Sequence, residues 1–197
     1  MLVVVGIIAI LIGAGMTTFS AATRKAQQAR AREVVSNVAT ALEAVYQKEG
    51  SFPRRVLAEG SSDGEMTAEV AYELARRKAM TLTYLDSSRR TTGLDRCGVL
   101  TPWGQDTVKR AGNGSVSDST KVPSGGTIKD HVVRYAIDLN GDGVIPGVSI
   151  GGESVDIRAT AVAWCCGKDG KMESYSAGLK KDDVYSWTIG QTRGVQK

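Results

Sequence analysis

The dominant hydrophobic pattern lies at the start of the chain. Residues 1–23 carry no charged side chain and are nearly all apolar or small. Residues 21–49 contain neither proline nor glycine, and their apolar positions recur with helical spacing on one face. That face consists of Val34, Val35, Val38, Leu42, Val45 and Tyr46. The pattern predicts one helix of nearly 50 residues, apolar all round in its first half, amphipathic in its second, and ended by Gly50.

Shorter elements are predicted in the next part of the chain. Residues 66–80 have the spacing of a second amphipathic helix, for which Asp63 or Ser62 would be the N-terminal cap. Its expected buried face consists of Met66, Val70, Ala71 and Leu74. Residues 107–127 are rich in Gly, Ser, Thr and Asn and predict a flexible loop.

Three later runs contain many β-forming residues with partial alternation: 131–138, 155–164 and 183–189. A long first helix followed by short strands predicts an α+β fold, in which the amphipathic half of the helix packs on a small antiparallel sheet. We therefore expect three parts. They are an apolar transmembrane or filament-core helix over 1–23, its amphipathic continuation over 24–50, and a globular domain over 51–197.

Charge constrains the interpretation of the first segment. A helix of 22 residues spans roughly 33 Å, enough to cross the hydrocarbon core of a bilayer. Basic side chains follow directly, at Arg24, Lys25, Arg30 and Arg32, and none precedes the apolar run. A secretory signal peptide needs a basic start, and the positive-inside rule would keep the domain of a plain membrane anchor in the cytoplasm. A native chain that begins upstream of Met1 would remove the charge conflict.

The first 53 residues resemble the long N-terminal helix of type IV pilin-like proteins, which include the pseudopilins of type II secretion. In that family a basic leader and a Phe-Thr-Leu-Ile-Glu-like segment precede the apolar run. A prepilin peptidase removes the leader, and the new N-terminus is methylated. This sequence begins just after the place where that segment would lie.

Two further stretches extend the resemblance to major pseudopilins. Residues 100–106 (LTPWGQD) are similar to the family's Asp-Pro-Trp-Gly-Asn-Pro segment, with Thr101 in place of Asp. A structural turn is expected there, with the Trp as an apolar anchor. The turn would consist of Pro102, Trp103 and Gly104. Residues 155–187 resemble the family's closing strand, Gly-x-Asp-Gly loop and Asp-Asp-Ile-x-x-Trp ending.

The resemblance implies a pilin-like fold and a structural function. The chain would be a subunit of a type IV pilus-like or type II secretion pseudopilus filament. It would wait in the bacterial inner membrane and then stand in the periplasm or on the cell surface. Its partners would be further copies of itself, the inner-membrane assembly machinery and minor pilins. Assembly would use the apolar helix, whose glycines permit close helix approach. The expected assembly residues are Leu2, Val5, Ile8, Leu11, Ile12, Gly13 and Gly15.

Other functions also fit the residues. One is a single-span, membrane-anchored domain for calcium-dependent binding or adhesion. Another is a pilin of DNA uptake, for which the net charge of +4 is weak support.

The first candidate metal site lies near the end of the chain. Asp169, Asp182 and Asp183 would meet if the excursion between them folds back, and Ca²⁺ would relieve the repulsion of their carboxylates. By resemblance, major pseudopilins bind calcium through the equivalents of these three residues. Lys180 and Lys181 depart from the family's more acidic pattern. An ordinary solvated loop is the alternative.

A second candidate is the segment DLNGDG. Asp138, Asn140 and Asp142 occupy its positions 1, 3 and 5, the spacing of a calcium-binding loop. The EF-hand pattern fails further on, because position 12 is Ser149. The alternative is a β-turn in which the Asp and Asn side chains bond to their own backbone.

Other reactive groups are few. The single histidine, His131, starts a predicted strand and is expected to be partly exposed. No Ser or Cys has the context of an activated nucleophile and no nucleotide-binding motif is present, so we expect no enzyme activity and no small-molecule substrate. Cys97, Cys165 and Cys166 lack the spacing of a zinc site. Buried free thiols are expected, and a disulfide from Cys97 to one of the pair is the alternative.

Overall fold

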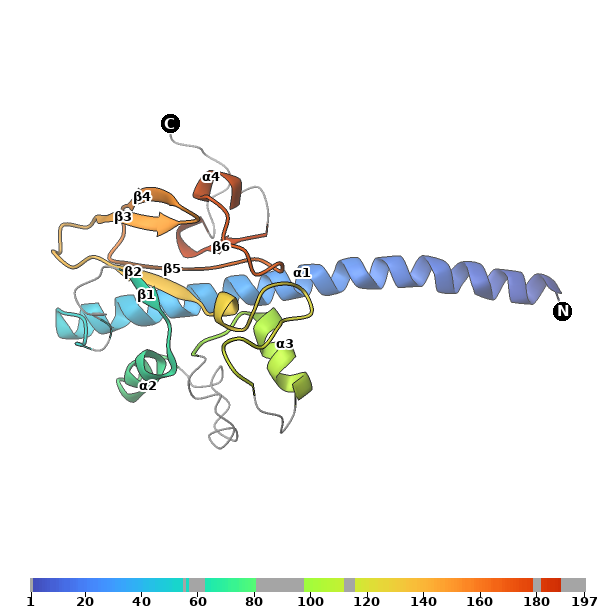
Figure 1. The fold of residues 1–197 in the computed structure, drawn as a ribbon, viewed down its shortest axis with the longest axis horizontal. Helices are drawn as coiled ribbons and strands as arrows, with labels where there is room; N and C mark the ends of the chain where they lie inside the picture. Colours follow the sequence, from blue (N-terminus) through green and yellow to red (C-terminus); the bar gives the residue numbers. More distant parts are fainter. Residues whose placement is uncertain are drawn as a thin grey trace.

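The computed structural model describes residues 2–54, 56, 63–80, 98–111, 116–178 and 182–188. The fold is α+β, as predicted, with one long N-terminal helix and two small antiparallel sheets (Figure 1). Helix α1 (Leu2–Glu49) is 48 residues long. Its second half packs on the domain, whereas its first half extends away from every other element (Figure 1).

The end of α1 and its buried face are as predicted. Gly50 has a φ of +70° and donates its N–H to the carbonyl of Tyr46 at 2.7 Å, which ends the helix. Five of the six predicted apolar positions are buried, and Tyr46 packs half-buried at the edge. Among the side chains described from Ser20 onward, residues 20–26 are exposed and the first buried residue is Ala31. We call residues 2–26 the stem.

The stem contains all the residues expected to assemble a filament. Leu2, Val5, Ile8, Leu11, Ile12, Gly13 and Gly15 belong to α1, but the side chains of residues 2–19 lie outside the described part of the structure. A search of the described residues finds no helix that is both long enough and apolar enough to cross a membrane.

The main sheet has four antiparallel strands in the order β1-β2-β5-β6. The central pair is β2 (Arg134–Ile137) and β5 (Ala161–Cys165), and the short edge strands are β1 (Asp63–Glu65) and β6 (Val184–Tyr185). A separate hairpin consists of β3 (Ile145–Ile150) and β4 (Glu153–Ile157). The predicted run 155–164 is therefore the end of one strand and most of another, separated by a bend over residues 158–160.

Strand β5 separates two apolar cores because its side chains alternate between its faces. Ala161, Ala163 and Cys165 belong to the core that contains the buried face of α1. Val162 and Trp164 belong to the core under the β3–β4 hairpin. Figure 1 shows β5 running along α1, with the hairpin on its other side. The small side chains on the first face let the helix lie close to the strand.

Helix α2 (Ala68–Arg76) lies within the predicted segment 66–80 but is shorter than it, and it buries Val70, Ala71 and Leu74 as expected. Met66 is also buried, but it precedes the helix. The predicted cap is wrong. Thr67 is the cap, and its hydroxyl accepts the N–H of Val70 at 3.4 Å. Asp63 cannot cap the helix because it belongs to β1, while Ser62 lies outside the described residues.

Helix α3 (Pro102–Ala111) corrects two further predictions. The Pro102–Gly104 segment is the first helical turn rather than a connecting turn, since proline is well suited to the first position of a helix. Trp103 is buried, as expected of an anchor. Residues 107–111 continue the helix, so the predicted flexible loop is wrong there.

Candidate metal centre

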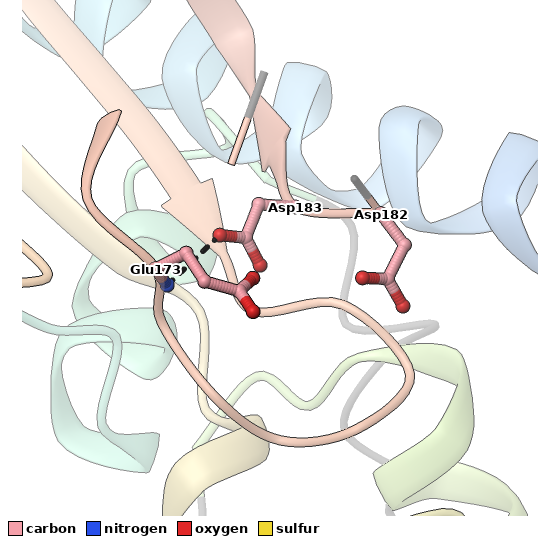
Figure 2. Close-up of side chains that lie close together, drawn as sticks. All are labelled: Glu173, Asp182 and Asp183. Carbon is pink, nitrogen blue, oxygen red and sulfur yellow. Dashed lines mark hydrogen bonds between the residues drawn. The ribbon is translucent and has the colours of Figure 1, made fainter. Parts of the chain in front are cut away.

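Three carboxylates come together beside the carboxyl end of β5. Glu173 lies in the loop that follows this strand, and Asp182 and Asp183 directly precede β6. One oxygen from each side chain lies within 4.8 Å of the others. Figure 2 shows the carboxylates of Glu173 and Asp183 next to each other, with that of Asp182 to one side. Chain reversal by the loop brings these groups together.

Asp183 is the most buried of the three, with only 9% of its surface exposed. Its carboxylate accepts the N–H of Gly167 at 2.8 Å and that of Glu173 at 3.2 Å. The Tyr185 hydroxyl donates to the same group at 3.3 Å. Burial raises the pKa of Asp183 to about 6, an effect that the two backbone donors oppose and the charge of Glu173 reinforces.

Asp182 is placed by a close backbone approach. One of its carboxylate oxygens accepts the N–H of Lys168 at 2.6 Å. The same carboxylate lies against the α-carbon of Gly167, where a β-carbon would collide with it. Glycine at position 167 therefore leaves the space that this carboxylate occupies.

The structure brings together two of the three predicted ligands. Asp169 is not in the carboxylate group, and its side chain accepts the N–H of Lys171 at 3.0 Å instead. Glu173 takes the third place and was missed by sequence reasoning. Glu173 was recognisable only as a carboxylate within the excursion between Asp169 and Asp182.

In the second predicted loop the Asp and Asn side chains bond to their own backbone, as in the alternative given for it. Asp138 is almost fully buried, and its carboxylate accepts the N–H groups of Asn140, Gly141 and Gly143 at 3.2, 2.8 and 2.7 Å. Asp142 accepts the side-chain amide of Asn140. These oxygens bond to the loop itself, and none belongs to a cluster of three metal-ligating side chains in the described chain.

An aromatic group supports the carboxylates from the side of β6. Tyr185 lies between Asp183 and the ring of Trp187, whose centroid is 5.1 Å from its own. The Trp187 indole N–H donates to the Tyr175 hydroxyl at 3.0 Å, and Trp164 meets Trp187 edge-on. The position of Asp183 is thus tied to a rigid apolar cluster.

A second loop packs against the loop that follows β5. Gly125 and Gly126 pack their backbone against Asp169 and Gly170, so closely that side chains there would collide with the neighbouring backbone. His131 holds this loop, since its Nε2 lies 2.9 Å from the Gly125 carbonyl. A carbonyl only accepts, so Nε2 carries the proton.

The prediction for His131 is wrong. The residue ends a 3₁₀ turn (η5, Lys129–His131) and is fully buried, because α3 and the 122–127 loop cover it. Its Nδ1 accepts the hydroxyl of Thr101 at 3.0 Å. Burial lowers the pKa of His131, which keeps the ring neutral.

Cys165 and Cys166 are buried free thiols, as expected, while Cys97 lies outside the described residues. The Cys166 thiol donates to the carbonyl of Asp130 at 2.8 Å. Burial, and after it the charge of Asp183, raises the pKa of Cys166. This thiol is therefore protonated near neutral pH and is not activated as a nucleophile.

The arrangement can hold a hard cation. Oxygens about 2.4 Å from a shared Ca²⁺ lie at most about 4.8 Å apart, which the three carboxylates satisfy. The pKa of Asp183 is raised by burial and, to a lesser extent, by the charge of Glu173, and a cation would offset both effects. Calcium takes six to eight oxygens, so backbone carbonyls or water would complete the shell.

We compared the chain with models of known protein families, with curated proteins and with solved structures, and none of them matches it.

Proposed function

We propose that this protein is a structural subunit of a type IV pilus-like or type II secretion pseudopilus filament. The extent of α1 beyond the domain is the observation that carries this proposal. A helix of 48 residues is about 70 Å long, whereas a domain of ~150 residues has a radius of gyration of only ~15 Å.

The division of α1 supports assembly through the stem. Its second half is already a wall of the core, so the domain folds around it. The backbone of its first half extends away from the domain (Figure 1), and its sequence is uncharged through Thr23. Copies of the stem packed together would remove this apolar segment from water. Before assembly the same segment would be held in the bacterial inner membrane.

Calcium would serve the same function by stabilising the end of the domain. A cation bound by Glu173, Asp182 and Asp183 would fix the loop after β5 to the segment before β6. Because the unfolded chain lacks this arrangement, binding would stabilise only the folded state. Contacts between neighbouring domains of the filament would then be built on an ordered surface.

The test is filament formation in a cell that carries an assembly machinery. We expect filaments in the sheared surface fraction for the native chain and none for Leu11→Glu, because a charge in the stem opposes its packing. Ala111→Glu is the matched control, since it adds the same charge at the exposed end of α3. A native chain that stays single in the membrane while its domain is folded would contradict the proposal and favour an anchored adhesion domain.

The N-terminus of the protein provides an independent test. Intact mass and N-terminal sequencing of protein purified from its native membrane should reveal a methylated residue upstream of Met1. An unmethylated chain that starts at Met1 would exclude prepilin processing. Salt-dependent retention of DNA in a gel-shift assay would instead support a role in DNA uptake.

A further inference from the structure

The buried ring of His131 joins three segments that are far apart in the chain. Its Nε2–H donates to the carbonyl of Gly125, in the 122–127 loop, at 2.9 Å. Its Nδ1 accepts the hydroxyl of Thr101, which directly precedes α3, at 3.0 Å. The sulfur of Cys166, just after β5, lies 3.6 Å from the same Nδ1. The neutral ring therefore connects the start of α3, the 122–127 loop and the end of β5.

The groups around Nδ1 are arranged for a ring nitrogen that carries no proton. The Thr101 hydroxyl is fully buried, donates to Nδ1 and lies 3.5 Å from the N–H of Gly104, which it accepts. The Cys166 thiol gives its proton to the carbonyl of Asp130 at 2.8 Å. A proton on Nδ1 would meet the hydroxyl proton, so the hydroxyl would have to turn and give up its acceptor inside the protein.

The acids near the ring are already hydrogen-bonded elsewhere. Asp130 and Asp169 are the carboxylates whose charges favour a protonated His131. The Asp130 carboxylate accepts the N–H and the hydroxyl of Thr127, and Asp169 accepts the N–H of Lys171. Burial outweighs the attraction of both charges, so the pKa of His131 is lowered. A charged ring would be buried without a carboxylate bonded to it in the described part of the chain.

The other segments around the ring do not supply a negative charge either. The 122–127 loop contains no titratable residue. The charged residues of α3 lie beyond its first turn, whereas the ring faces Thr101 at its N-terminal end. That end carries the positive pole of the helix dipole, which also disfavours a cation. The charged residues of α3 are Asp106, Lys109 and Arg110.

The 122–127 loop in turn holds the loop that follows β5. The backbone of Gly125 and Gly126 packs on that of Asp169 and Gly170 so closely that a β-carbon on Gly125 would collide with it. Glu173, one of the three carboxylates of the candidate metal centre, lies three residues beyond Gly170. Movement of Gly125 would therefore remove a support from the loop that carries this carboxylate.

We propose that His131 is an acid-sensitive latch, which holds the 122–127 loop against the loop after β5 while the ring is neutral and releases both loops when it is protonated. In the open form the ring reaches water, where its charged form is stable. Because the closed form has the lower pKa, the latch holds fully above pH 6.5 and weakens as the pH falls below that value. The latch needs neither a cation nor filament assembly.

The experiment measures hydrogen exchange by mass spectrometry on the full chain in detergent, with a chelator, at pH 7 and pH 5. Each rate is divided by that of an unstructured peptide at the same pH. The variant is His131→Gln, whose amide can donate to Gly125 and accept from Thr101 but does not take up a proton. From pH 7 to pH 5, opening of residues 122–127 and 167–171 should rise about 3-fold to 25-fold more in the native chain. The upper value is the limit for one proton on an ordinary histidine.

Strands β2 and β5 are the internal control, because their exchange should not differ in this way between the two proteins. Asp183 also titrates in this range, but it is present in both proteins and its effect cancels. Equal opening of the loops in both proteins would overturn the proposal. A rise in β2 and β5 as large as that in the loops would also overturn it, since acid would then unfold the domain as a whole.

A second measurement uses the native chain alone, in case His131→Gln does not fold. His131 is the only histidine of the chain, so its imidazole signals in an NMR spectrum of untagged protein are identified directly. We expect the Nε2–H tautomer at pH 7, and protonation only together with the loss of protection in residues 122–127. Protonation at the ordinary pKa while the loop stays protected, or loop opening while the ring stays neutral, would overturn the latch.

Discussion

At the scale of single residues, the carboxylate of Asp183 links the stability of the domain to pH. Its pKa rises from 3.8 to about 6 on folding, so the folded state favours the protonated form. Stability from this group is full below pH 4 and is lost as the pH rises through 6. Without metal, the free energy of unfolding of the native chain should fall by about 3 kcal/mol at most, relative to that of Asp183→Asn, as the pH rises from 4 through 6.

Urea unfolding of both proteins at several pH values in a chelator measures this difference. The lowered pKa of His131 affects stability with the opposite sign, but His131 is present in both proteins and its contribution cancels. A difference that stays constant from pH 4 to pH 7 would show that Asp183 ionises in the fold as freely as in the unfolded chain.

The ligand set can be resolved by three substitutions. Gly167→Ala places a methyl group where the Asp182 carboxylate lies, and Asp182→Asn removes its charge. Both should abolish the rise in melting temperature that we expect Ca²⁺ to cause in the native chain. Asp169→Asn should retain that rise, because Asp169 bonds within its own turn and is not in the cluster. Calorimetric scans with and without Ca²⁺ measure the response, and its loss in Asp169→Asn would restore the set predicted from sequence.

The sequence identified the carboxylates of the cluster only in part. Asp182 and Asp183 were found because two adjacent acids in a loop are costly and suggest a cation. Choosing between Asp169 and Glu173 requires the path of the loop, which depends on the packing of Gly125 and Gly126 against it. Neither residue signals that packing by its type or spacing.

At the scale of elements, one glutamine side chain joins α1 to α3. Gln27 donates to the Asp106 carboxylate at 3.0 Å and accepts the indole N–H of Trp103 at 3.0 Å. Gln27→Ala would leave both partners without it and should reduce the free energy of unfolding by about 1–3 kcal/mol. Gln28→Ala is the matched control and should change stability by less than about 0.5 kcal/mol.

Urea unfolding of the two variants side by side measures this contribution. If both substitutions lower the free energy of unfolding equally, the loss comes from shortening a glutamine on α1 and not from the hydrogen bonds of Gln27 to α3. The bond lies where α1 leaves the domain, so it marks the boundary between the packed helix and the stem.

Helix α1 was the most predictable element, because its apolar residues recur with helical spacing over several turns. The stripe from Val34 to Tyr46 fixed the buried face of α1, and Gly50 fixed its end, because both signals are local. Helix α3 was missed because Pro102 and Gly104 are typical of turns. Gly104 has another reason to be glycine, since a β-carbon there would lie 3.0 Å from that of His131. Whether residues 102–104 form a turn or a helix therefore depends on tertiary packing, which the local sequence does not show.

At the scale of the whole molecule, the stem and the domain should be separable. Residues 20–26 are exposed, and among the α1 side chains that the structure describes, from Ser20 onward, the first buried one is Ala31. Removal of residues 1–23 should therefore change the free energy of unfolding of the domain by less than about 0.5 kcal/mol. The same deletion should abolish self-association, which sedimentation velocity of both chains in detergent measures. A shortened chain that still self-associates would place the contacts between copies in the domain.

The position of α1 also determines how the molecule would bear a mechanical load. The helix is a continuous rod that lies along β5, and the small side chains of that strand let the two run close together (Figure 1). Tension applied at the N-terminal end of the rod acts along the contact instead of across it. All the contacts from Ala31 to Val45 are then loaded at once and must slip together, whereas a perpendicular pull would open them one by one. The domain is thus built to resist being drawn off the packed half of α1.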